Sequence, residues 1–215
     1  MSYKLAIFDL DGTILDTLED LKESTNAALA ASGYPARTLD EVRCFVGNGI
    51  GKLIERAVPQ GTSKEATKKT LESFKAYYGI HCADHTKPYD GILELLENLR
   101  KSGIQTAVVS NKADFAVQEL CSQYFPDAFD FVVGEREGIR RKPCPDSVFE
   151  VLRTLKKMTD EAVYIGDSDV DVETAKQAGM DGIFVSWGFR GREFLIEHGA
   201  SCIVDTPKEL EKLLV

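Results

Sequence analysis

The sequence predicts an α/β protein in which a parallel β-sheet forms the core and an all-helical segment is inserted after the first strand. Short apolar segments alternate with segments of helical spacing in residues 86–215, a pattern typical of βαβ units with right-handed crossovers. Residues 17–85 carry helical patterns and no strand pattern. We therefore expect a discontinuous core of residues 1–16 and 86–215 and a helical insert of residues 17–85.

The insert is expected to contain four helices. Two segments, Thr38–Glu41 and Thr62–Glu65, have the form of a capping box, in which a Ser or Thr is followed three residues later by Glu. Thr17 is expected to cap the first helix, because acidic residues follow it in the first helical turn. The expected helices run from Thr17 to Gly33, from Thr38 to an interruption at Val46–Gly49, over about residues 50–57, and from Thr62 to about Tyr78.

The core is expected to alternate strands with helices. Its first strand is the apolar start of the segment Leu5–Thr13, because a short apolar run indicates a buried strand. The further strands are expected at residues 104–109, 129–133, 162–165, 182–185 and 202–204. The intervening helices are expected at about residues 92–101, 115–124, 146–157, before Gly179, at 194–197, and from Thr206 to the end.

Composition excludes several classes of function. A formal net charge of -9 argues against a nucleic-acid surface, although the local charge at a site can still favour a small anion. No apolar run is long enough for a membrane span, and the N-terminus lacks the pattern of a signal peptide. The five cysteines are scattered and lack metal-ligand spacing, so we expect reduced thiols and a cytoplasmic location.

Two carboxylates at the end of the first strand indicate chemistry. Asp9 and Asp11 are two residues apart, so their side chains point to the same side of a strand, and Gly12 then permits a tight turn. Adjacent carboxylates repel each other unless one is protonated or a cation lies between them. This favours a metal ion, with one carboxylate attacking and the other moving protons. For this stretch alone, a strand followed by an Asx turn remains the alternative.

Polar residues follow three more of the predicted strands. Ser110 comes after residues 104–109, Lys142 lies in the loop after 129–133, and Asp167 follows 162–165. Because parallel strands end at the same edge of a sheet, we expect these residues to meet Asp9 there. Taken singly, they also fit a turn, a surface lysine and a helix cap. Their occurrence at four strand ends favours one shared site.

The expected chemistry is phosphoryl transfer. Asp9, the Asp11 main-chain carbonyl and Asp167 supply the hard oxygen ligands that Mg²⁺ prefers. Asp9 is expected to attack phosphorus and form an aspartyl-phosphate, while Asp11 protonates the leaving oxygen and then deprotonates the attacking water. The remaining residues of the expected site bind phosphate (Ser110, Asn111 and the catalytic Lys142) or support their neighbours (Thr13 and Asp171).

Four motifs of the chain resemble those of the haloacid dehalogenase superfamily, in the same order. They are Asp9-Leu10-Asp11-Gly12-Thr13, Ser110-Asn111-Lys112, Lys142-Pro143 and the segment Gly166–Asp171. The resemblance implies a Rossmann-like core, a helical cap after the first strand, and Mg²⁺-dependent phosphatase chemistry through Asp9. Val46–Gly51 and Trp187-Gly188-Phe189 are most similar to the phosphoglycolate phosphatases of that superfamily. This implies 2-phosphoglycolate or a similar small metabolite as the substrate.

The substrate contacts and the exact reaction stay open at this point. Gly47 and Asn48 of the cap and Lys112 of the core are the candidate substrate contacts. Related alternatives are a pyrophosphatase, a sugar-phosphate phosphatase or a phosphomutase. A signalling receiver or a binding module with a phospho-acceptor Asp belongs to a different class, and the helical insert and Asp11 argue against it. We expect a monomer or weak dimer that binds no nucleic acid and no membrane.

Overall fold

The computed structural model describes residues 3–215, and the chain divides into two units. The first, here called the core unit, comprises the chain up to Leu15 together with Pro88–Val215. The second, the helical unit, is Asp16–Lys87.

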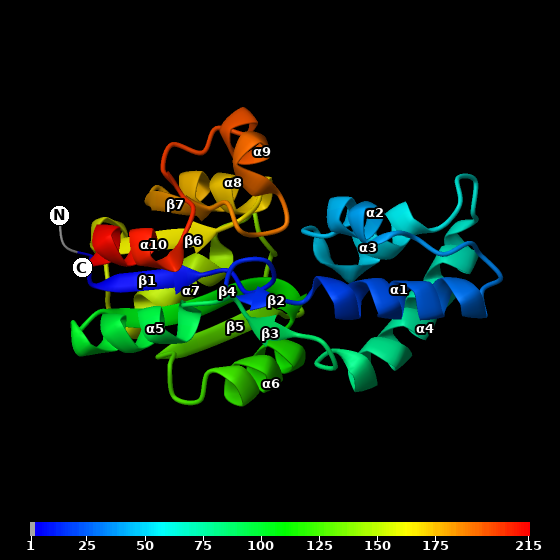
Figure 1. Cartoon of the computed structure of the whole chain (residues 1–215), viewed down its shortest axis with the longest axis horizontal. Coiled ribbons are helices and arrows are strands. Elements are labelled where there is room, and N and C mark those ends of the chain that lie inside the picture. The colour runs from blue at the N-terminus through cyan, green and yellow to red at the C-terminus, as the bar shows by residue number, and fades with distance from the viewer. Residues whose placement is uncertain (1–2) are drawn as a thin grey trace. The chain divides into compact units, whose positions relative to one another are not determined.

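The core unit is built on a six-stranded sheet. Its strands are β1 (Leu5–Phe8), β4 (Gln105–Ala113), β5 (Phe131–Glu135), β6 (Ala162–Gly166), β7 (Asp181–Val185) and β8 (Ile203–Val204). Their order is β5-β4-β1-β6-β7-β8, and all neighbours pair in parallel. Figure 1 shows β1, in blue, inside this sheet. The α/β class with a parallel sheet and a helical insert is thereby confirmed.

Helices connect the strands of the core unit and cover both faces of its sheet. They are α5 (Ile92–Lys101), α6 (Asp114–Tyr124), α7 (Asp146–Leu155), α8 (Asp169–Ala178), α9 (Gly191–Glu197) and α10 (Pro207–Leu214), with a short 3₁₀ helix, η1 (Thr159–Glu161), before β6. One face packs with α7, α8 and α9 in a cluster that includes Leu5, Ile7 and Tyr164. Because side chains alternate along a strand, Ala6 and Phe8 point to the opposite face. All four residues of β1 are fully buried, as expected for a strand with neighbours on both sides.

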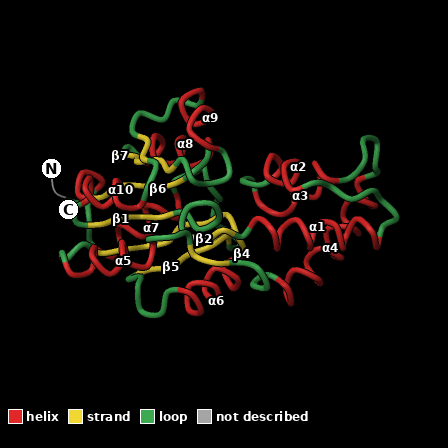
Figure 2. The backbone as a smooth tube through the Cα atoms, in the orientation of Figure 1, coloured by secondary structure: helices red, strands yellow, loops and turns green. Residues whose placement is uncertain are grey.

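The helical unit contains α1 (Leu18–Ala31), α2 (Leu39–Phe45), α3 (Gly49–Ala57) and α4 (Lys64–His81). Figure 2 shows only helix and loop from α1 to α4. The capping box at Thr38 is confirmed, since the Glu41 N–H donates to Thr38 Oγ1 at 3.2 Å and the Thr38 N–H donates to Glu41 Oε2 at 2.8 Å. Within this unit, the buried Asp20 carboxylate accepts the N–H groups of His85 and Thr86 at 2.9 and 2.8 Å. The first turn of α1 is therefore tied to the segment that ends the unit.

The second predicted capping box is wrong. Helix α4 is capped by Ser63, whose hydroxyl accepts the Ala66 N–H at 3.2 Å. The Thr62 hydroxyl instead donates to the Pro59 carbonyl at 2.7 Å, so the preceding turn already uses it. The helix therefore begins one residue later than the sequence pattern indicates.

Two other local details also differ from the expectation. The Thr17 side chain makes no capping hydrogen bond, and the Leu18 N–H donates to Asp16 Oδ1 at 3.3 Å instead. Strand β4 continues past residue 109, because Ala113 pairs again with β5 after a break in register at Val109.

The chain passes between the units through two short strands. These are β2 (Leu15–Asp16) and β3 (Lys87–Pro88), which form a separate two-stranded sheet. None of the helices in residues 3–215 combines the length and the apolar character that a membrane span requires.

Candidate active site

The first motif lies at the carboxyl end of the central strand. The Asp9 N–H donates to the Ile165 carbonyl at 2.8 Å, so the hydrogen bonding between β1 and β6 continues up to the first carboxylate. The chain then turns at Gly12, whose φ of +86° lies in the region that favours glycine. The Asp9 and Asp11 side chains are 12% and 17% exposed. A rigid, buried strand end therefore presents both carboxylates.

Lys142 is the residue on which the other elements converge. It lies in the loop between β5 and α7, and its side chain is only 4% exposed. Its ammonium lies 2.8 Å from Asp9 Oδ1 and 2.8 Å from Asp171 Oδ1, and it donates to the Tyr164 hydroxyl at 3.0 Å. The structure thus brings together groups that follow β1, β5 and β6.

The Asp171 carboxylate is surrounded by hydrogen-bond donors. Its Oδ1 accepts from Lys142 and, at 3.2 Å, from the Tyr164 hydroxyl. Its Oδ2 accepts the N–H groups of Asp167 and Ser168 at 3.2 and 3.1 Å and the Ser168 hydroxyl at 2.6 Å. An ionised carboxylate offers about four lone-pair sites. Those of Asp171 are occupied, which leaves Asp9 and Asp167 as the carboxylates with room for another partner.

Asp167 is held in a narrow space made by glycines. Its Oδ2 accepts the Phe189 N–H at 2.7 Å, and the Thr13 hydroxyl lies 3.5 Å from its Oδ1. A Cβ atom on Gly12 would lie 2.4 Å from Asp167 Oδ2, and one on Gly188 would lie 2.4 Å from Asp167 Cβ. Both distances are shorter than real Cβ contacts. Glycine is therefore required at both positions for this carboxylate to stay where it is.

The second motif contacts both the first and the third. The Lys112 N–H donates to Ser110 Oγ at 3.2 Å, and the Asn111 amide donates to the Lys142 carbonyl at 3.1 Å. The Lys112 ammonium, 4% exposed, pairs with Asp11 Oδ1 at 2.7 Å. Asp11 and Asp9 thus have different cationic partners, Lys112 and Lys142. Two carboxylates in different environments can take different roles in proton transfer.

Burial and charge shift the ionisation of the cluster. Burial raises the pKa of the Asp9 carboxyl to about 7, although Lys142 opposes this. Burial, together with the charges of Asp171 and Asp9, raises the pKa of Asp167 well above its ordinary value. Burial would lower the pKa of the Lys142 ammonium, but Asp171 and Asp9 raise it well above its ordinary value. Lys142 therefore stays charged, while Asp9 and Asp167 hold a proton more readily than ordinary carboxyl groups do, because full ionisation would leave more negative charge than one ammonium can balance.

The cluster fits a divalent cation. Oxygens of Asp9, Asp167 and Asp171 lie within 4.8 Å of one another, and among residues 3–215 no other trio of potential metal ligands lies as close. If all three carboxylates were ionised, the one ammonium of Lys142 would leave two negative charges unbalanced. Buried like charges of this kind are stable only with protons or a cation. An all-oxygen donor set favours a hard ion such as Mg²⁺.

The predicted substrate contacts Gly47 and Asn48 lie in the helical unit, between α2 and α3. Asn48 Oδ1 accepts from the Arg56 guanidinium at 2.7 Å, and Arg56 also donates to the Phe45 carbonyl at 2.7 Å. The segment is thus bound to α3 within its own unit. A role for Gly47 and Asn48 in substrate binding stays a prediction.

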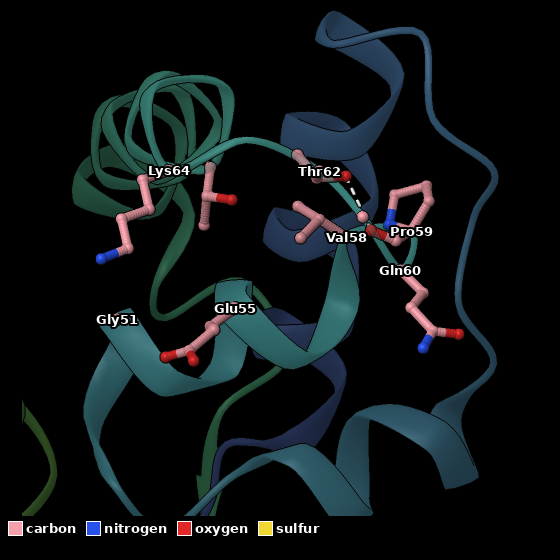
Figure 3. Close-up of a pocket in the computed structure, with 9 residues that line it drawn as sticks. Gly51, Glu55, Val58, Pro59, Gln60, Thr62 and Lys64 are labelled. Atoms are coloured by element: carbon pink, nitrogen blue, oxygen red, sulfur yellow. Dashed lines mark hydrogen bonds between the residues drawn. The ribbon is translucent and has the colours of Figure 1, made fainter.

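The helical unit also has a surface hollow of about 420 Å³ between the end of α3 and the start of α4 (Figure 3). Glu55 and Lys64 lie on its rim, both exposed, and Glu55 already pairs with Lys52 at 2.7 Å. In Figure 3 the dashed line joins Thr62 to Pro59, the contact that displaces the predicted capping box. No buried charged group lines this hollow, so it does not compete with the carboxylate cluster as a catalytic site.

Sequence reasoning missed Tyr164 and the backbone support from Gly188 and Phe189. A signal for Tyr164 was present, because a hydroxyl inside the apolar run 162–165 needs a partner when buried. No comparable signal exists for the Phe189 N–H. A main-chain group carries no sequence identity, and its contact with Asp167 spans 22 residues.

The amino-acid sequence of this chain is similar to those of known proteins. Residues 6–185 match the model of the family described as haloacid dehalogenase-like hydrolase. A phosphoglycolate phosphatase of Pseudomonas savastanoi pv. phaseolicola is 32% identical over 214 residues, which cover 96% of this chain and 78% of the relative. The phosphoglycolate phosphatase of Vibrio parahaemolyticus is 32% identical over 218 residues, which cover 96% of this chain and 94% of the relative.

A solved structure is also similar along the whole chain. The crystal structure of a candidate phosphoglycolate phosphatase from Lactobacillus delbrueckii subsp. bulgaricus has a TM-score of 0.96 and 42% sequence identity. The match covers 100% of this chain and 99% of the other.

Proposed function

We propose that this chain, which belongs to the haloacid dehalogenase-like hydrolase family, is a Mg²⁺-dependent phosphatase that acts through an aspartyl-phosphate on Asp9. Family membership confirms the resemblance predicted from its motifs. The chain is an enzyme, a phosphoric monoester hydrolase similar to phosphoglycolate phosphatases. The observation that carries the proposed mechanism is the contact of the buried Lys142 ammonium with Asp9 on one side and Asp171 on the other.

In the first step, an ionised Asp9 oxygen forms a bond to phosphorus while the bond from phosphorus to the ester oxygen breaks. Asp11 gives its proton to the leaving oxygen, so the product departs as a neutral alcohol group. The Lys142 ammonium lies against Asp9 and balances the charge of the phosphoryl oxygens. The Ser110 hydroxyl and the Asn111 amide are the proposed neutral donors to the same oxygens.

In the second step, Asp11 takes a proton from water. The resulting hydroxide attacks phosphorus, the bond from Asp9 to phosphorus breaks, and inorganic phosphate leaves. Asp11 is then protonated again, ready for another ester. Its contact with Lys112, 2.7 Å from Oδ1, keeps the carboxylate in one orientation between the two proton transfers.

Asp9, the Asp11 main-chain carbonyl and Asp167 are the residues that would hold the cation. A Mg²⁺ ion bound by these oxygens would supply positive charge that lowers the repulsion between the phosphoryl oxygens and the attacking carboxylate. The Gly12 and Gly188 contacts keep the Asp167 carboxylate in place. Asp171, whose lone pairs are already occupied, is proposed to orient Lys142 rather than bind the ion.

The proposed substrate is 2-phosphoglycolate or a similar small phosphorylated metabolite, after the names of the relatives. The cytoplasm is the proposed location, because all five cysteines are free thiols, as in a reducing compartment. A monomer or weak dimer is the proposed state, to be measured by light scattering.

The test is phosphate release from a panel of esters, with Mg²⁺ and with EDTA. The panel contains 2-phosphoglycolate, several sugar phosphates and pyrophosphate, and it includes a sugar monophosphate with and without its bisphosphate. The wild-type chain should release phosphate from 2-phosphoglycolate only with Mg²⁺, and Asp9→Asn should release none. Asp160→Asn, which changes an exposed carboxylate in η1 at the other edge of the sheet, is the matched control and should behave as wild type. Near-wild-type turnover by Asp9→Asn would overturn the mechanism, and isomerisation without phosphate release would indicate a mutase.

A further inference from the structure

The Lys142 ammonium has no hydrogen-bond donor to spare. A lysine carries three N–H donors, and three protein groups take them: Asp9 at 2.8 Å, Asp171 at 2.8 Å and the Tyr164 hydroxyl at 3.0 Å. Any contact with a substrate oxygen must therefore replace one of these three. The partner that is replaced, and the two that remain, decide where the ammonium stands during the reaction.

Asp171 and Tyr164 are suited to remain hydrogen-bonded to Lys142 during the reaction. The Asp171 carboxylate is fully buried and fixed by Asp167 and Ser168. The Tyr164 ring is fully buried in the core cluster beneath the site. Asp9 is the partner that changes, since its own oxygen is the proposed attacking atom and a phosphoryl group would lie beside it. A substrate oxygen can then take over the donor that points to Asp9.

The Tyr164 hydroxyl is placed as a link between two charged groups. It accepts from Lys142, and it lies 3.2 Å from Asp171 Oδ1 and 3.5 Å from the Val109 carbonyl, to either of which it can donate. Its ring lies 5.6 Å from the Lys142 ammonium, within the range of cation–π attraction. Burial raises the pKa of this hydroxyl well above its ordinary value, so it keeps its proton.

A tyrosine is not needed here for packing alone. The residues around it in β6 are apolar, and a phenylalanine ring would fill the same volume. Burying a hydroxyl is unfavourable unless it finds hydrogen-bond partners. The partners that it finds are the lysine and the carboxylate of the site, so the hydroxyl serves the site rather than the core.

We propose that Tyr164 is a positioning residue that, together with Asp171, anchors the Lys142 ammonium so that its third N–H points at Asp9 and at the phosphoryl group bound there. This inference rests on the proposed phosphatase function. Lysine has a long flexible side chain, and its three donors rotate freely about the terminal bond. Two fixed partners on a tetrahedral ammonium set the direction of the remaining donor. With Asp171 alone, the ammonium can turn away from Asp9.

The variant Tyr164→Phe tests this by removing one oxygen atom and keeping the ring. We expect kcat to fall by about ten- to a hundredfold, the factor that corresponds to a hydrogen bond to a charged group, and KM to rise by up to about tenfold, because the same N–H contacts the phosphoryl group of the bound ester. The matched control is Tyr3→Phe, which removes a hydroxyl 2.9 Å from Asp181 in the same unit, before β1, and should leave kcat unchanged. An unchanged kcat in Tyr164→Phe would overturn the inference.

A double-mutant cycle separates positioning from a general structural effect. In a Lys142→Met background, Tyr164→Phe should lower the residual rate by less than about twofold, because the group that it positions is gone. A further loss of tenfold or more in that background would mean that Tyr164 acts without Lys142, and would contradict the proposal.

A binding measurement tests the role of Tyr164 without requiring catalytic turnover. Titration of inorganic phosphate into the Mg²⁺-loaded protein by calorimetry should show about tenfold weaker binding for Tyr164→Phe than for wild type and Tyr3→Phe. Equal phosphate affinities would overturn the inference. If the wild type binds phosphate but hydrolyses no ester, the proposed function fails while this result still decides the role of Tyr164.

Discussion

The stability of the metal-free protein should fall as the pH rises, because burial raises the pKa of Asp9. The carboxyl has a pKa of about 7 in the folded chain, against an ordinary value of 3.8. The folded state therefore holds a proton that the unfolded state has released, and holding it stabilises the fold. This contribution is fully present below about pH 4 and is lost as the pH rises through about 7.

The size of the effect follows from the difference between the two pKa values. Each unit corresponds to 1.36 kcal/mol, so a rise from 3.8 to about 7 corresponds to about 4 kcal/mol over the whole range. Between pH 5 and pH 8 the loss in the free energy of unfolding should be about 2–3 kcal/mol. The variant Asp9→Asn has no proton to release at this position, so it should lack this part of the pH dependence.

The assay is urea unfolding in EDTA at pH 5 and pH 8, for wild type, Asp9→Asn and the exposed control Asp160→Asn. The free energy of unfolding of wild type minus that of Asp9→Asn should fall by about 2–3 kcal/mol from pH 5 to pH 8. Asp160→Asn should follow wild type. Added Mg²⁺ should stabilise the wild type more at pH 8 than at pH 5, since the cation favours the ionised cluster. If the curves of wild type and Asp9→Asn stay parallel, the account of the buried carboxylates is wrong.

Three further substitutions test other parts of the structure. Gly188→Ala should lower the free energy of unfolding by about 1–3 kcal/mol and weaken Mg²⁺ binding in calorimetry, because the new Cβ would lie 2.4 Å from Asp167 Cβ; unchanged metal affinity would count against this packing. Thr38→Ala should lower the free energy of unfolding by about 1 kcal/mol through loss of the confirmed capping box, as measured in urea, and a stability equal to wild type would contradict it. Lys112→Gln should lower kcat and lower the free energy of unfolding by about 3 kcal/mol, because the Asp11 carboxylate loses the Lys112 ammonium. Kinetics and urea unfolding that match wild type would refute the pairing of Lys112 with Asp11.

Local patterns in the sequence predicted most of the secondary structure. The apolar run at Leu5–Phe8 predicted the buried central strand, and the capping box at Thr38 predicted the start of α2. Both depend on contacts between residues that are close in sequence. The wrong prediction at Thr62 also concerns residues that are close in sequence. Its hydroxyl had two possible partners a few residues away, and it bound the Pro59 carbonyl. A pattern indicates that a contact is possible, and the local geometry selects between competing contacts.

The candidate site could be predicted in part because its charged residues follow strands. Parallel strands end at one edge, so Asp9, Lys142 and Asp167 were expected to lie together, and Lys142 does lie 2.8 Å from Asp9. The pairing of Lys112 with Asp11, by contrast, could not be derived. The sequence shows a lysine near the end of a strand, but the break in register after Val109 directs this side chain.

Residue types and their order were sufficient to predict the α/β class, the helical insert and the kind of chemistry, because periodicity and strand-end position are local properties of the chain. The environment of each charge depended on folding. Only packing buries Asp9 enough to raise its pKa to about 7, and only packing aligns the Tyr164 hydroxyl with Lys142 and the Phe189 N–H with Asp167. These contacts join residues 22 positions apart or involve the main chain, and their energies come from the exclusion of water that the assembled sheet and helices provide.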